Sequence, residues 1–111
     1  MMIAVAGPYS ASSEELEKKN LDLMNEAAAG VYKKGHIPVI GVNAALYIIE
    51  KLPEEKRYEA MMEISLAIVN KCDAILLIGE SPGANIERDL ILAQGKPVFK
   101  LLEDIPENNL I

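Results

Sequence analysis

Residues 79–87 combine side chains that can bind an anion with one that can attack a carbon centre. Ser81 offers a hydroxyl, Gly83 lets the backbone approach a ligand closely, and the free N–H groups that open a helix attract negative charge. We therefore predict a cradle for a phosphate or a carboxylate in this segment. A turn from strand to helix also uses glycine for conformational reasons, and that structural interpretation fits these residues equally well.

Glu87 falls on the apolar side of the helix that this segment begins. At 100° per residue it lies between Leu90 and Ile91, whereas Arg88 and Asp89 fall outside the apolar arc. A carboxylate in this position is expected to stay ionised beside the helix start while it is shielded from bulk water. Such a group suits nucleophilic attack on an electrophilic sugar carbon. The alternative is a first-turn glutamate that the helix dipole alone favours.

Residues 7–10 add polar groups directly after the first apolar run. Tyr9 is predicted to orient Glu87, and Gly7 and Ser10 are predicted to contact the substrate. An ordinary turn with a partly exposed tyrosine accounts for the same residues about as well.

Four further polar residues need an explanation. Asn43 follows the second apolar run, where we expect it to cap a short helix and to join the substrate site. Asn20 and Ser65 each interrupt an apolar helical stripe, so each must bond a neighbouring group or face a cavity. We expect a structural role for Asn20 and leave both possibilities open for Ser65. His36 follows a helix-ending glycine, far from the other candidates, and is expected to be structural.

Predicted strands and helices alternate along the chain around these residues. The pattern predicts strands at about 2–6, 37–42, 73–78 and 97–102 and helices at about 13–34, 43–50, 55–71 and 84–94, with an acidic tail over 103–111. Alternating strands and helices indicate an α/β domain with a parallel sheet of four or five strands between two helical layers, as in Rossmann-like and flavodoxin-like folds. Strand C-ends share one edge of such a sheet, so the loops at 7–10, 43 and 79–83 should meet there.

Composition limits the classes of function. The 111 residues suit a single domain, and the net charge of −6 with a pI near 4.8 would repel a nucleic-acid polymer while leaving a small phosphorylated ligand possible. One Cys and one His form no disulfide and no recognisable zinc set, so no metal is expected. No apolar stretch approaches the roughly 20 residues that span a bilayer. We therefore expect a cytoplasmic protein with no membrane partner.

Several motifs together resemble the nucleoside 2-deoxyribosyltransferase-like superfamily, which includes deoxynucleoside 5′-monophosphate N-glycosidases. The resemblance covers nearly the whole chain, and its most specific parts are the Gly-Pro-Tyr start and the Ser-x-Gly-x-x-x-Glu element. The matching residues are Ala6-Gly7-Pro8-Tyr9-Ser10, Asn20, Gly35-His36-Ile37-Pro38, Cys72-Asp73-Ala74, Ser81-Pro82-Gly83 with Glu87, Ala93, and Gly95-Lys96-Pro97-Val98.

The resemblance implies a mechanism and a site. Glu87 would attack the anomeric carbon to give a glycosyl-enzyme ester, Tyr9 would position it, and Ser81 with Gly83 would hold a 5′-phosphate. The enzymes of this superfamily use no cofactor and commonly form homodimers or larger assemblies in which a neighbour completes the pocket. The expected activity is that of an N-glycosidase or 2-deoxyribosyltransferase acting on a nucleoside or nucleoside 5′-monophosphate.

One departure from the superfamily pattern keeps other interpretations open. Ser65 occupies the position where these enzymes usually carry an aspartate that assists the leaving base, and a serine is no strong general acid. A non-catalytic nucleotide-binding module is therefore one alternative. A phosphoribohydrolase of the lysine-decarboxylase-like type is another, although its usual double-glycine turn followed by Gly-Thr is missing here.

Overall fold

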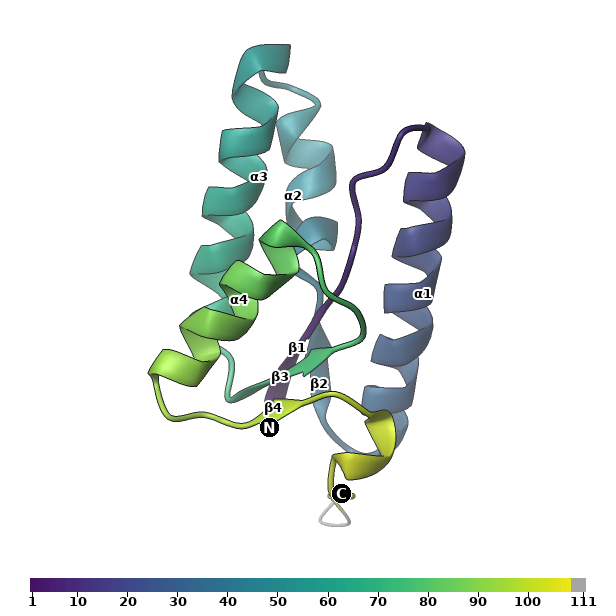
Figure 1. Ribbon diagram of the computed structural model, residues 1–111, viewed down its shortest axis with the longest axis vertical. Helices are drawn as coiled ribbons and strands as arrows, with labels where there is room; N and C mark the ends of the chain where they lie inside the picture. The colour runs from purple at the N-terminus through teal and green to yellow at the C-terminus, as the bar shows by residue number, and fades with distance from the viewer. Residues whose placement is uncertain (109–111) are drawn as a thin grey trace.

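The computed structural model describes residues 1–108, which fold as a four-stranded parallel sheet with helices on both faces (Figure 1). This confirms the predicted three-layer, Rossmann-like or flavodoxin-like α/β architecture. The elements in chain order are β1 (Met2–Ala6), α1 (Glu14–Lys33), β2 (Ile37–Val39), α2 (Gly41–Ile49), α3 (Glu54–Val69), β3 (Ala74–Leu77), α4 (Pro82–Ala93), β4 (Val98–Phe99) and a short 3₁₀ helix, η1 (Leu102–Asp104).

The strands lie in the order β2-β1-β3-β4, so β1 and β3 are the central pair. Ile3 pairs with Ala74 and Ala6 with Leu77, and this register brings the two central strands to the same edge. Residues that follow Ala6 and Leu77 therefore emerge side by side. The predicted convergence of residues 7–10 and 79–83 rests on this pairing.

Side chains of the central strands alternate between two apolar cores. Ile3 and Val5 pack on the α1 side, where Met24 and Val31 of α1 are buried, whereas Ala4 and Ala6 pack on the opposite side. Figure 1 shows α1 alone on one side of the sheet and α3 with α4 on the other. Because both faces are covered, the strands are continuously apolar, as the sequence of 73–78 indicated.

Helix starts differ from the prediction in two places. The backbone enters α2 at Gly41 with Ile40 as its N-cap, so the expected cap at Asn43 is wrong, and Asn43 lies within the first turn. Helix α4 begins at Pro82, two residues earlier than predicted, because the Ser81 side chain caps it and proline suits a first helical position. Helix α1 begins after Ser13, whose side chain caps it by accepting the N–H of Leu16.

The outer strands are shorter than predicted, and part of the expected tail is structured. After β4 the chain forms η1 and buries Ile105 against the α1 side of the sheet. Lys34 Nζ donates to the carbonyls of Leu102 and Ile105 at 2.7 and 2.8 Å, which ties this segment to the end of α1. Residues 109–111 of the predicted tail lie outside the described residues. No helix within residues 1–108 is both long and apolar enough to cross a membrane.

Candidate functional site

A cavity of about 190 Å³ opens where β1, β2 and β3 end, between α3 and the start of α4. It brings together every predicted site residue except Asn43. The lining residues are Gly7, Tyr9, Ser10, Val42, Tyr58, Met61, Met62, Ser65, Ser81, Pro82, Gly83, Ala84 and Glu87.

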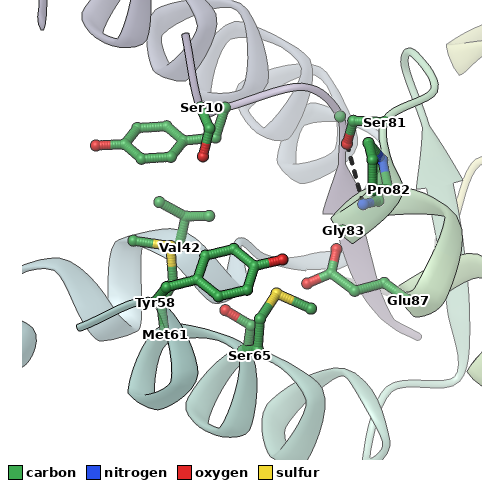
Figure 2. Close-up of a pocket in the computed structure, with 13 residues that line it drawn as sticks. Ser10, Val42, Tyr58, Met61, Ser65, Ser81, Pro82, Gly83 and Glu87 are labelled. Carbon is green, nitrogen blue, oxygen red and sulfur yellow. Dashed lines mark hydrogen bonds between the residues drawn. The ribbon is translucent and has the colours of Figure 1, made fainter. Parts of the chain in front are cut away.

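Glu87 projects from α4 into this cavity (Figure 2). Its side chain is buried, with 9% of the residue exposed, and within residues 1–108 it forms no hydrogen bond or ion pair. Burial raises the pKa of Glu87 from 4.5 to about 7. The expectation that the helix start would keep this carboxylate ionised is therefore wrong. A helix dipole contributes about 1 kcal/mol or less near its end, and desolvation outweighs it here.

The first turn of α4 has few donors left for a ligand. The Ser81 hydroxyl accepts the N–H of Ala84 at 3.1 Å, and the Ser81 carbonyl accepts the N–H of Asn85 at 2.8 Å (Figure 2 shows the first of these bonds). Pro82 has no N–H. Only the N–H of Gly83 remains without a partner among the described residues. Within the first turn of α4, the predicted anion cradle thus keeps one free backbone donor, plus the hydrogen of the Ser81 hydroxyl.

Ser65 lies at the wall of the cavity on α3. The residue is 2% exposed, and its Oγ is a buried polar atom without a hydrogen-bond partner in the described part of the chain. A Cβ added to Gly41 would lie 2.7 Å from the Ser65 Cβ, so α2 can approach α3 this closely only because residue 41 is glycine. Ser65 therefore bonds no neighbouring group among the described residues, and it is one of the residues that line the cavity.

Tyr9 reaches the cavity from the loop after β1. Asn20 Nδ2 donates to the Tyr9 carbonyl at 3.0 Å, which confirms a structural role for Asn20. Burial raises the pKa of the Tyr9 phenol, and the negative charges of Glu17 and Glu14 raise it further. The Tyr9 hydroxyl and Glu87 form no hydrogen bond in this structure, so the orienting role of Tyr9 stays a prediction.

Tyr58 is a lining residue that sequence reasoning did not place in the site. Its ring extends across the cavity with the hydroxyl directed toward the Glu87 side of the site, while most of the residue is exposed (Figure 2). Tyr58, Met61, Met62 and Ser65 have the spacing of one helix face. That spacing was a usable signal, because Ser65 was already a candidate and the other three share its face. Their apolar surface can pack against a planar ring.

Two predicted residues lie away from the cavity. Asn43 Nδ2 donates to Asn25 Oδ1 on α1 at 2.9 Å, and Val42 lines the cavity in its place. The structure therefore does not bring Asn43 to the substrate site. His36 is buried at the opposite edge, with Nδ1 3.1 Å from the Met1 amino group and Nε2 2.6 Å from the Pro106 carbonyl. These contacts confirm the structural role expected for His36.

The site offers no ready place for a cation. Within residues 1–108, no group of three or more His, Cys, Asp or Glu side chains lies together in a way that could hold a metal ion. Arg88 neighbours Glu87 in sequence, but its guanidinium bonds Glu80 and Asp89 instead. Glu87 is therefore the only carboxylate among the lining residues and faces no positive charge.

Comparison with known protein families places the chain within a family. The family model described as a domain of unknown function (DUF4406) matches residues 1–100, which contain every residue that lines the cavity. No curated protein matches the chain.

Proposed function

The chain belongs to the DUF4406 family, and we propose that this member is an N-glycosidase or 2-deoxyribosyltransferase acting on a nucleoside or nucleoside 5′-monophosphate. The observation that carries the proposal is the buried Glu87 carboxylate, which faces a cavity without a hydrogen-bond partner. A carboxylate used only for stability would be paired, because burying an unpaired one costs free energy. Buried carboxylates that lack a partner and have a raised pKa are typical of active sites.

The reaction follows from the position of Glu87. In its ionised form, one carboxylate oxygen attacks the anomeric carbon of the sugar, and the bond from that carbon to the base nitrogen breaks. The base leaves with the bonding electron pair and takes a proton from water. Water then hydrolyses the glycosyl ester on Glu87, or a second base accepts the sugar. The resemblance to the nucleoside 2-deoxyribosyltransferase-like superfamily in Tyr9, Ser81, Gly83 and Glu87 supports the same assignment.

The rest of the cavity suits a nucleoside. Tyr58, Met61 and Met62 offer an apolar wall on which a base can stack, and Ser65 offers a hydroxyl that can donate or accept a hydrogen bond. A nucleoside has the same combination of one planar apolar face and several polar edges. A bound nucleoside would also give the Ser65 hydroxyl, which is unpaired among the described residues, a hydrogen-bond partner.

One observation favours a second candidate, a nucleotide-binding module without turnover. Glu87 is the only carboxylate that lines the cavity, so no second acid is placed to protonate the leaving base. Without such help, cleavage is restricted to bases that leave readily. A binding module would use the same pocket, with Glu87 as a hydrogen-bonding group.

Base release separates the two candidates. The purified protein is incubated with the common ribonucleosides, deoxyribonucleosides and their 5′-monophosphates, and free base is measured by chromatography beside Glu87→Gln. Release by the parent protein and its loss in Glu87→Gln support the glycosidase. Thermal stabilisation by a nucleoside with no base released after long incubation supports the binding module. Neither release nor stabilisation across the panel, with folded protein, contradicts both.

We also propose a homodimer or larger homo-oligomer. Large apolar side chains lie exposed on three helices, including Tyr47 of α2, Tyr58 of α3 and Ile86 of α4, and of these Tyr58 lines the cavity. A second copy would remove this surface from water. Light scattering after size exclusion gives the mass directly, and a monomer at all concentrations contradicts the proposal.

A further inference from the structure

We propose that the cavity selects a neutral nucleoside over the corresponding nucleoside 5′-monophosphate, an inference that rests on the proposed function and narrows its substrate class. Three features of the described residues carry it: the absence of a cationic side chain from the lining, the shortage of free amides at the start of α4, and the acidic side chains beside the cavity mouth.

The first feature is the distribution of positive charge. No Lys or Arg is among the residues that line the cavity. Several of those elsewhere have their charged groups engaged: Arg88 with Glu80 and Asp89, Lys96 with the Cys72 carbonyl, and Lys34 with the carbonyls near η1. A phosphate entering the cavity would therefore lose its hydration without meeting a counter-charge.

The second feature is the helix start that would otherwise replace a cation. Phosphate sites at helix N-termini use several free backbone N–H groups aimed at one anion. In α4 the Ala84 and Asn85 amides are already bonded to Ser81, and Pro82 contributes none. The single Gly83 amide and the Ser81 hydroxyl can satisfy one sugar hydroxyl or one base carbonyl. These two donors of the helix start are fewer than the three oxygens of a phosphate.

The third feature is negative charge at the mouth. The Glu17 carboxylate accepts the N–H of Ala11 at 3.4 Å, which places it next to Ser10 on the cavity lining. Glu14 lies in the same first turn of α1, and the charges of both residues raise the pKa of Tyr9. With Glu87 ionised inside, a phosphate would face negative charge from two sides. A neutral nucleoside meets the same polar groups without this repulsion.

The test compares matched pairs of substrates, such as 2′-deoxyadenosine and 2′-deoxyadenosine 5′-monophosphate. For each substrate, kcat/KM for base release is measured about one pH unit above the pKa of Glu87, where most of this carboxylate is ionised. We expect kcat/KM to be at least about tenfold higher for the nucleoside at low ionic strength, a ratio that falls as salt screens the charges. A smaller ratio overturns the inference. If base is released but the monophosphate is preferred, the proposed function stands and only the selectivity is wrong. If no substrate reacts, the proposed function itself fails.

A charge reversal at the mouth tests the cause. Glu14→Lys should lower the preference for the nucleoside by about threefold or more, because it replaces repulsion of the phosphate by attraction. Glu26→Lys changes the net charge equally on the same helix but lies two to three turns from the mouth, so it should leave the ratio unchanged. Both variants are checked by thermal unfolding. Equal ratios in the two variants, with both proteins folded, overturn the electrostatic explanation.

Discussion

The carboxylate of Glu87 and the hydroxyl of Ser65 face one cavity from two different helices, and neither is hydrogen-bonded to another residue in the described part of the chain (Figure 2). Unpaired buried polar groups destabilise a fold, so two of them in one cavity indicate that a ligand completes their bonding.

Glu87→Gln keeps the shape of the side chain and removes the nucleophile. We expect kcat for base release to fall on the order of 10³-fold or more, because an amide oxygen does not form the glycosyl ester. Nucleoside binding should persist, which is measured by isothermal calorimetry or thermal shift. Base release by the variant at the parent rate would exclude Glu87 as the nucleophile.

The pH dependence of catalysis reports the ionised fraction of Glu87. Because burial raises its pKa to about 7, kcat/KM should rise with pH and level off above that value. Each pH unit below the pKa should lower kcat/KM by about tenfold. The profile is obtained from initial rates in buffers of constant ionic strength. The rates cover about two pH units on either side of the pKa of Glu87. A plateau that extends unchanged to pH 5, about two units lower, would show that the reacting carboxylate is not desolvated.

The same raised pKa makes the protein less stable as pH rises. Folded Glu87 holds its proton up to about pH 7, whereas the unfolded chain releases it near 4.5. Below pH 4.5 Glu87 is protonated in both the folded and the unfolded chain, so the free energy of unfolding does not depend on this group. Between pH 4.5 and 7 the free energy of unfolding falls by about 3 kcal/mol. Urea unfolding of the parent and Glu87→Gln at both ends of this range measures the difference. The parent should lose stability relative to the variant, and parallel pH curves would contradict the prediction.

Ser65→Ala removes a buried hydroxyl that has no partner in the fold. We expect the free energy of unfolding to stay equal or rise by about 1 kcal/mol, since no internal hydrogen bond is lost. Nucleoside affinity should drop by about threefold to tenfold if this hydroxyl bonds the ligand. Urea unfolding and calorimetry give the two numbers. Unchanged affinity would remove Ser65 from the binding site.

Ser81→Ala is the same chemical change with the opposite effect on stability. Ser81 caps α4 through its bond to the Ala84 N–H, so its loss should cost about 1 kcal/mol. Ser12→Ala is the matched control, because Ser12 is exposed and lies outside the helix whose cap is Ser13. Its effect should stay within about 0.5 kcal/mol. Equal unfolding free energies for the two variants would show that the cap does not support α4.

The α/β class, the central strands and the inward side of Glu87 could all be predicted from the sequence. Each of these depends on local periodicity: continuous apolar runs at 2–6 and 73–78, and a helical arc that contains Leu90 and Ile91 around Glu87. Helix and strand periods are set by backbone geometry, so they can be read without knowing the neighbours. Gly35 and Gly95, which follow two of the predicted helices, have positive φ, as glycines at helix C-termini commonly do.

The protonation state of Glu87 and the surroundings of the other site residues depend on the tertiary structure. The raised pKa of Glu87 depends on how much of α3 and the β1 loop covers it, and that coverage is a sum over residues distant in sequence. The packing of α2 and α3 around Gly41 likewise decides three features of the site. It leaves the Ser65 hydroxyl without a hydrogen-bond partner among the described residues, brings Tyr58 to the cavity and keeps Asn43 away from it. Desolvation and hydrogen-bond pairing depend on contacts between residues that are distant in sequence, and the local periodicity of a sequence does not predict these contacts.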